Sequence, residues 1–408
     1  MITIGKIPRN VQRFFQPLRT HFTGPAWGHF CGLVMAFTIG HGSTIERLAK
    51  LLRGSTHRTN HGEFLWQSHW DEPSVLQSIA LDTLGRLYRK HGGKCYFILD
   101  DTQTLKRAQR MEAVGTLFHH ATGTYGRGHT ILKACLWYRG VTIPLGSWLY
   151  VKKDDAKRVK IDFRKLTELA AKAIRNLVLP KGITPTVLFD SYYLCPVVVG
   201  ACRERGFHFV GVGKANRNFT VHGQTHKLGS YGRNVLRRKG RWHHITGLRT
   251  TGRYRLAERV GSLKKLGEVK VVFSRRRNDR SVMALVTDDL HASSKTLVAD
   301  YLKRWAIEVL IKDEKQQLGL GDYRVLRYRS VVRHLHLVDC AYACLTHLAL
   351  KDQGAQGQQK NKNVLHLPTV GQLKARMRQV AWQEAVQDVV KHSHEKPVIR
   401  RLEKLLAA

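Results

Sequence analysis

The sequence predicts an α/β fold in which helical regions precede and follow the strand-bearing part of the chain. Short apolar runs of strand type alternate with helical patterns from about residue 95 to 213. Two of these runs, at 95–99 and 186–189, each lead directly into an aspartate. The segments before residue 90 and after residue 330 have helical periodicity. With 408 residues and 43% hydrophobic content, the chain is long enough for two or three domains.

The N-terminal region, about 26–90, is predicted to be helical. Ser43 and Glu46 have the spacing of a capping box, and apolar residues then recur at helical intervals. A second amphipathic run covers 73–88. The basic, turn-rich segment 53–61 separates the two helices, which suits a DNA-reading helix-turn-helix and equally an ordinary helical bundle.

The middle of the chain places carboxylates after apolar strands. Residues 95–99 lead into Asp100, and 186–189 lead into Asp190. We therefore expect two buried strands to present carboxylates at their C-terminal ends. Asp101 adds an ambiguity, because adjacent residues of a strand point to opposite faces and only one of the pair can face Asp190.

The remaining elements follow from the same patterns. Residues 214–289 are rich in Arg, Gly and Thr with short strand-like pieces, which indicates a β-rich insertion. The polar segment 353–363 indicates a flexible connection between C-terminal helices. Further strands are expected at 130–138, 141–151 and 207–212, and further helices at 163–177 and 195–205.

A long helix is predicted over 293–318. On a helical wheel, Tyr301, Arg304, Glu308 and Lys315 fall within an arc of about 60°. Taken alone, this stripe suits a solvated charged face with an Arg304–Glu308 ion pair, which contributes only tenths of a kcal/mol. A functional face is the alternative.

The charge balance indicates a polyanionic partner. Lys and Arg number 69 against 30 Asp and Glu, a net charge of +39 that makes nucleic acid the natural candidate. A merely solvated basic surface, or an RNA-binding structural protein, is the alternative that charge leaves open. The basic stretches 233–255 and 275–277 are the expected contacts. No membrane partner is expected, since no basic helix accompanies a hydrophobic span.

The cysteines and the first residues indicate a reducing compartment. The seven cysteines form no CxxC pair and most lie in apolar runs, which favours buried thiols over a zinc site or disulfides. The chain begins without an apolar signal core, and the stretch 30–40 is far shorter than the ~20 residues of a spanning helix. We expect the protein in the cytoplasm.

Together these residues resemble a known family, the DDE transposases of bacterial insertion sequences. Tyr301, Arg304, Glu308 and Lys315 match all four positions of the Y-x2-R-x3-E-x6-K helix that marks one large class of that family. Asp100 and Asp190 resemble its two strand-end aspartates, and alignment with the family favours Asp100 over Asp101. The resemblance covers about residues 95–320.

The resemblance implies a ribonuclease-H-like mixed-sheet core that carries a β-rich insertion between the second Asp and the Glu. Asp100, Asp190 and Glu308 would be the catalytic residues and would hold two Mg²⁺ ions, with Mn²⁺ as a possible substitute. Tyr301, Arg304 and Lys315 would hold a DNA phosphate. The implied divisions are 1–90 (helical, DNA-binding), 91–213 (first part of the core), 214–289 (insertion), 290–330 (core completion) and 331–408 (helical).

The implied activity is metal-dependent strand cleavage and strand transfer at the terminal inverted repeats of an insertion sequence, by a cut-and-paste route through a hairpin. The implied partners are the terminal repeats and target DNA, bound by a homodimer or larger synaptic complex associated with the bacterial nucleoid. Two alternatives remain, a noncatalytic DNA-binding descendant of a transposase and a ribonuclease-H-like structure-specific nuclease.

Overall fold

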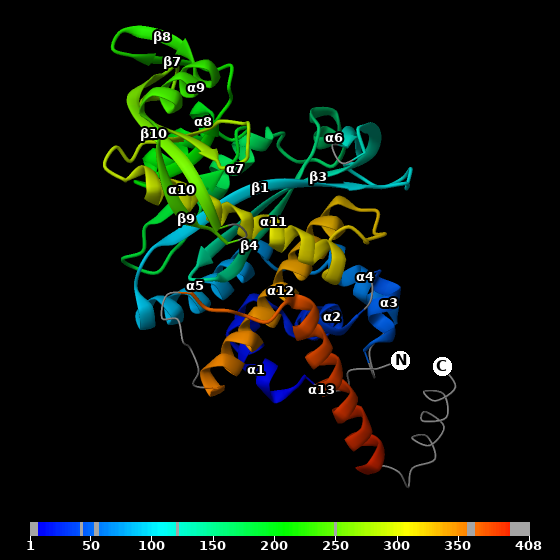
Figure 1. Cartoon of the computed structure of the whole chain (residues 1–408). Helices are drawn as coiled ribbons and strands as arrows, with labels where there is room; N and C mark the ends of the chain where they lie inside the picture. The colour runs from blue at the N-terminus through cyan, green and yellow to red at the C-terminus, as the bar shows by residue number, and fades with distance from the viewer. Residues whose placement is uncertain are drawn as a thin grey trace.

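A single large sheet organises the molecule (Figure 1). The computed structural model describes residues 7–40, 44–52, 57–119, 122–248, 251–356 and 364–391. Within these ranges, twelve strands join into one mixed sheet, in the order β2-β3-β1-β5-β6-β12-β11-β10-β7-β8, with β4 paired to β3 and β9 to β10. The predicted α/β class, with a mixed sheet and flanking helices, is confirmed.

The two aspartate-bearing strands are neighbours in this sheet. β1 (Cys95–Leu105) pairs antiparallel with β3 (Thr124–Tyr138) and parallel with β5 (Pro185–Phe189). β4 (Val141–Tyr150) extends the sheet beyond β3, and β6 (Phe209–Gly213) runs parallel to β5. The resulting order β4-β3-β1-β5-β6 brings the two strands together, as the resemblance implied.

One prediction about β1 is wrong. Asp100 was expected at the end of its strand, but β1 continues through Asp100 to Leu105. The pairing with β5 stops at Ile98, whereas the pairing with β3 continues until Leu105 lies opposite Gly128. The second neighbour therefore keeps the chain extended beyond the carboxylate.

The segment 214–289 is rich in strands, as predicted, and these strands extend the same sheet because β12 pairs with β6. Helix α9 (Leu228–Lys239) was not predicted. Two glycines inside α9 lower its helix propensity by about 1 kcal/mol each. They allow close packing, since a Cβ at Gly232 would overlap the Phe273 ring. The strands are β7 (Asn218–Val221), β8 (Gln224–Lys227), β9 (Arg241–Thr246), β10 (Thr251–Leu263), β11 (Gly267–Arg276) and β12 (Met283–Thr287).

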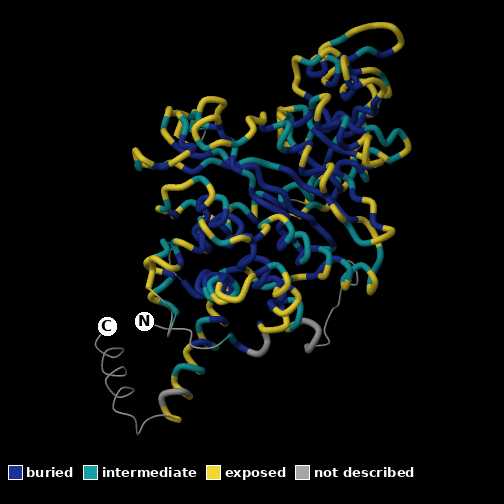
Figure 2. The backbone as a smooth tube through the Cα atoms, turned by 180° about the vertical axis from the view of Figure 1, so that it is seen from behind, coloured by how far each residue is buried: buried dark blue, intermediate teal, exposed yellow. Residues whose placement is uncertain are grey.

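Helices cover both faces of the sheet and enclose a core on each side (Figure 2). α12 (Tyr328–Gln356) packs on β4 and on α2 (Gly24–Ile39), whereas α7 (Leu166–Arg175) packs on the opposite face together with α8 (Pro196–Glu204). The other helices and the remaining strand are α1 (Arg9–Phe15), α3 (Ile45–Lys50), α4 (Arg58–Trp66), α5 (Glu72–His91), α6 (Lys153–Arg158), α13 (Val370–Lys391) and β2 (Gly115–His119).

The helical N- and C-terminal regions are confirmed, with local corrections. Thr44 caps α3 by accepting a hydrogen bond from the Arg47 amide at 3.3 Å. Ser43 and residues 53–56 lie outside the described residues, and α4 occupies the second half of the expected turn-rich segment. α12 runs to Gln356, four residues into the expected connection, and the rest of that connection is also undescribed.

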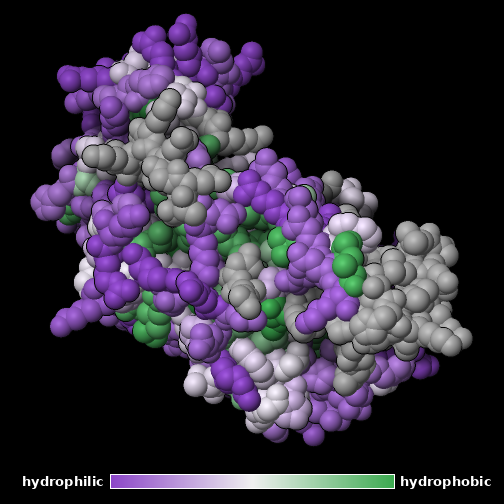
Figure 3. Space-filling model, turned by 90° about the horizontal axis from the view of Figure 1, so that it is seen from below, coloured by the Kyte–Doolittle hydropathy of each residue, from purple (hydrophilic) through white to green (hydrophobic). Residues whose placement is uncertain are grey.

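The surface is mainly polar. Figure 3 shows hydrophilic side chains over most of the face seen from below, with smaller hydrophobic patches among them. All seven cysteines are unpaired, and all but Cys195 are buried. Among the described residues, no helix is both long enough and apolar enough to span a membrane.

Candidate active site

Strand register places Asp100 and Asp190 on the same face of the sheet. β1 and β5 are parallel, and Ile98 pairs with Leu188. Two residues further on, Asp100 and Asp190 occupy equivalent positions and point the same way, because side chains alternate along a strand. Ile98 and Leu188 belong to one core, which identifies the face that the two carboxylates share.

The predicted helix over 293–318 lies against that face but contains two irregular turns. α10 (Ser294–Tyr301) passes through a 3₁₀ turn at Leu302–Arg304 into α11 (Trp305–Asp313). A π-helical turn, Glu314–Leu318, then ends at Gly319, whose φ of 70° is left-handed. α11 packs on β1 and β3. The helix therefore brings Glu308 to the face that carries both aspartates.

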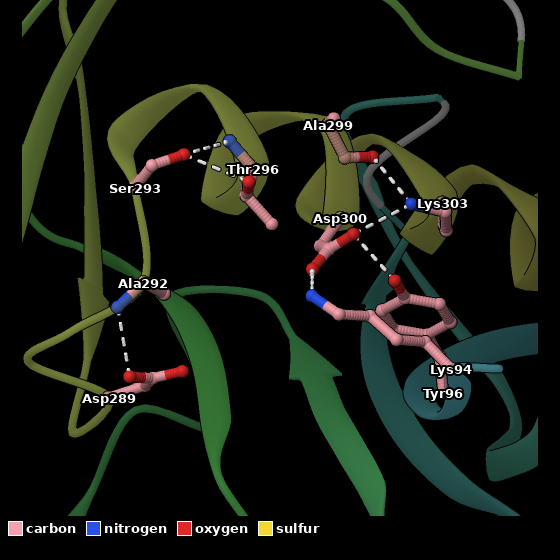
Figure 4. Close-up of polar contacts among 9 residues, drawn as sticks. All are labelled: Lys94, Tyr96, Asp289, Ala292, Ser293, Thr296, Ala299, Asp300 and Lys303. Atoms are coloured by element: carbon pink, nitrogen blue, oxygen red, sulfur yellow. Dashed lines mark hydrogen bonds and ion pairs between the residues drawn. The ribbon is translucent and has the colours of Figure 1, made fainter.

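Polar contacts fix the start of this helix on β1 (Figure 4). Ser293 caps α10. Asp300 accepts hydrogen bonds from the Tyr96 hydroxyl at 2.5 Å, from Lys94 at 3.0 Å and from Lys303 at 2.8 Å. Because Lys94 immediately precedes β1 and Tyr96 is its second residue, these contacts hold the helix that carries the predicted stripe in place relative to the strand.

Arg304 joins two of the predicted catalytic carboxylates. Its Nη1 lies 2.6 Å from Asp100 Oδ2, and its Nη2 donates to Glu308 Oε1. The Arg304–Glu308 ion pair of an ordinary helix thus exists, but here it also includes a carboxylate from β1. Burial raises the pKa of Asp100 to about 6, although Arg304 opposes the rise, and nearby Asp190 adds to it. Asp100 therefore lies where further positive charge would be favourable.

Asp190 has different partners. Its Oδ1 accepts hydrogen bonds from the backbone amides of Tyr192 at 2.9 Å and Tyr193 at 3.4 Å, which fixes the turn after β5. Among the described residues, no group of three or more His, Cys, Asp or Glu side chains lies close enough together to hold a metal ion. The Arg304 guanidinium lies between Asp100 and Glu308. Asp100 and Glu308 nevertheless already hold one cation, the Arg304 guanidinium, and carboxylate oxygens are also the ligands that hard divalent ions prefer.

Asp101 points to the opposite face of β1. The Tyr193 hydroxyl donates to Asp101 Oδ1 at 2.8 Å, and Tyr193 belongs to the core on that other side. The structure therefore separates Asp101 from Glu308, whereas it brings Asp100 to the Glu308 helix.

We expect Asp101→Asn to retain strand cleavage within a few-fold of the wild type, because Asn can still accept the Tyr193 hydrogen bond and faces away from Glu308. Initial cleavage rates on duplex DNA, compared with those of Asp100→Asn, measure this. Loss of cleavage in Asp101→Asn, with Asp100→Asn still active, would reverse the assignment of the strand faces.

The other residues of the stripe lie along the same strand. Tyr301 is buried, and its ring centre lies 6.0 Å from the Arg304 guanidinium. Burial raises the pKa of Tyr301 to about 12. Lys315 lies within the π turn and donates to the Gln103 carbonyl at 2.9 Å. Arg304 and Lys315 are thus spaced along β1 on one side of the molecule.

A buried charged network behind Asp100 was missed by the sequence analysis. Lys133 lies opposite Asp100 on β3, and its Nζ is 2.7 Å from Glu314 Oε2 and also contacts Asp339. The Ser147 hydroxyl donates to Asp339 at 2.7 Å. Lys133, Glu314 and Asp339 are fully buried, and burial raises the pKa of Glu314 well above its usual range. Two features of the sequence could have indicated this network, a Lys within an apolar strand and an Asp within an apolar helix, because charged residues are seldom buried without a partner.

A comparison with protein-family models identifies the superfamily of this chain. A family model described as DDE superfamily endonuclease matches residues 21–258. The match covers more than half of the chain and includes Asp100 and Asp190, although it ends before Glu308. The chain belongs to the DDE superfamily endonucleases.

The fold also resembles that of a solved transposase. The piggyBac transposase, in a synaptic complex with hairpin DNA, superposes with a TM-score of 0.50 at 10% sequence identity. The alignment covers 96% of this chain and 80% of the piggyBac chain. A search among curated proteins found no match in sequence.

Proposed function

We propose that this DDE superfamily endonuclease is a DNA transposase that cleaves DNA at the terminal inverted repeats of an insertion sequence and joins the cut ends to target DNA. The arrangement of Arg304 carries the proposal. It links Asp100 of β1 to Glu308 of α11 on the face that Asp190 shares. A charged helix stripe that only kept the surface soluble would not be expected to contact a strand carboxylate whose pKa is raised.

Asp100, Asp190 and Glu308 would hold two Mg²⁺ ions, which Mn²⁺ could replace. When bound, such ions stabilise the attacking and leaving oxygens of an in-line phosphodiester displacement. Arg304 would then release its carboxylates and turn to a DNA phosphate, for which its fork of donors is suited. Lys315 and Tyr301 would contact the same DNA end.

The proposed substrate is double-stranded DNA, as the net charge of +39 favours. Both ends of one element have to be held together for cut-and-paste transposition, so we propose a homodimer or larger synaptic complex. The piggyBac complex was solved with hairpin DNA. We propose that this chain also forms a hairpin, through attack of a released 3′-OH on the opposite strand.

A cleavage and joining assay tests the proposal. The substrate is DNA that carries the sequences flanking this gene, mixed with a target plasmid in Mg²⁺. Cuts at defined ends followed by joined products would support a transposase. Cuts without joining would favour a structure-specific nuclease, and specific binding without cuts in Mg²⁺ or Mn²⁺ would favour a noncatalytic DNA-binding protein.

We expect Arg304→Gln to bind Mn²⁺ at least about fivefold more tightly and yet to cleave DNA more slowly. Removing a positive charge ~4 Å from the metal relieves about 1–4 kcal/mol of repulsion, but the DNA phosphate loses its donor. Calorimetric titration with Mn²⁺ and cleavage rates measure the two effects. An unchanged Mn²⁺ affinity would show that the guanidinium does not occupy the cation position.

A further inference from the structure

A second positively charged site lies at the far end of β1. A cavity of about 570 Å³ opens there between three parts of the chain that are distant in sequence. α3 contributes Arg47, the segment after β1 contributes Lys106 and Arg107, and the loop after the π turn contributes Asp322 and Arg324. The cavity thus joins the helical N-terminal region to the two segments that continue from the catalytic strand and the catalytic helix.

The cavity is strongly cationic, with four basic side chains against the single acid Asp322. Arg47, Arg107 and Arg324 are exposed, and none makes an ion pair with a carboxylate of the described residues. Arginines that gather around a hollow without a carboxylate partner among the described residues repel one another, and an anion bound among them relieves this repulsion. This arrangement favours an anionic ligand.

Lys106 makes the floor of the cavity rigid. Its Nζ donates to the carbonyl groups of Gly321 at 2.6 Å and Tyr323 at 3.1 Å. It also lies 3.3 Å from the centre of the Tyr323 ring. These partly buried contacts fix the backbone of the loop that carries Arg324 against the end of β1.

The distance from the catalytic face fits a DNA strand. A strand rises about 3.3 Å per residue, so the five steps from Asp100 to Leu105 span about 17 Å. Each nucleotide of a duplex strand advances about 3.4 Å along the axis, so this distance corresponds to about five nucleotides. Lys315, hydrogen-bonded to Gln103, lies between the two positions. Cations are therefore spaced along β1 from the catalytic face to the cavity.

We propose that this cavity binds one backbone phosphate of the DNA substrate, about five nucleotides from the cleavage point, and that Arg47 and Arg324 hold it from opposite sides. The inference rests on the proposed function only in taking DNA as the substrate. It gives α3 of the N-terminal region a direct contact with DNA beside the catalytic core.

The test measures the salt dependence of binding to a 30-base-pair duplex of unrelated sequence without divalent metal, so that no cleavage is needed. Arg47→Gln and Arg324→Gln are compared singly and together with the wild type. Because both arginines hold one phosphate, the double variant should lower the slope of log K against log[salt] by about 0.9 in total. Each single variant should lower the slope by no more than about 0.9, and a lysine at either position should restore most of the wild-type slope.

Lys172→Gln is the matched control, since Lys172 is an exposed cation on α7, on the face of the sheet opposite to Asp100 and outside the segments expected to contact DNA. Its slope should equal that of the wild type. An unchanged slope in the double variant, or additive losses totalling about 1.8, would overturn the shared phosphate site. Either of these two results would leave the proposed function intact if the protein cleaves DNA. Lower slopes in the variants of a protein that cleaves no DNA would support the phosphate site and count against the catalytic proposal.

Discussion

Glu308→Gln is expected to abolish strand cleavage while DNA binding stays within a few-fold of the wild type. The substitution removes one charged oxygen ligand from the predicted metal site but keeps the size of the side chain and one acceptor for Arg304. A metal centre contributes several kcal/mol to stabilising the transition state, and about 4 kcal/mol corresponds to a ~1000-fold loss of rate. Cleavage and binding are measured on the same labelled duplex.

Asp313→Asn is the control on the same helix. Asp313 lies five residues after Glu308, about 140° further round the helix axis, and takes no part in the Asp100–Arg304–Glu308 ion pairs. It should cleave at nearly the wild-type rate. Cleavage by Glu308→Gln at more than about a tenth of the wild-type rate would remove Glu308 from the catalytic group and restore the interpretation of a solvated ion pair.

Lys133→Met is expected to lower the free energy of unfolding by about 3–5 kcal/mol, because it leaves two carboxylates buried without their cation. Glu314 and Asp339 would then face each other in the core, where an unpaired charge is strongly unfavourable. Urea unfolding followed by circular dichroism measures the change. The expected effect is larger than for any exposed ion pair of the molecule, which contributes about 0–1 kcal/mol.

The triple variant Lys133→Met, Glu314→Gln and Asp339→Asn separates charge from packing. It removes the carboxylates together with their cation, so it should recover much of the stability that the single variant loses. A loss below about 1 kcal/mol in Lys133→Met would contradict a network in which this lysine compensates both acids.

The sequence was informative where local pattern alone determines structure. Apolar runs before Asp100 and Asp190 predicted both strands, and helical spacing predicted that Glu308 and Arg304 share one face. The end of β1 could not be predicted in this way, since it depends on pairing with β3, a strand distant in sequence. Helix α9 could not be predicted from local pattern either. Its glycines disfavour a helix, and the close packing against Phe273 that explains them arises only in the folded protein.

The buried network was beyond the sequence analysis for a related reason. Lys133, Glu314 and Asp339 come from a strand, a π turn and a helix, and only the fold brings them together. The π turn itself moves Lys315 relative to a regular helical wheel. The domain boundaries at residues 90, 213, 289 and 330 stay predictions, as do the catalytic roles.

The most direct test of the account is the position of bound metal. Crystals of the protein with DNA and Mn²⁺, measured at the manganese absorption edge, would locate the ions by anomalous scattering. We expect manganese between Asp100, Asp190 and Glu308, with Arg304 released from both of its carboxylates. Saturating Mn²⁺ with no ion at these carboxylates, and with Arg304 still bridging Asp100 and Glu308, would contradict the proposed metal site.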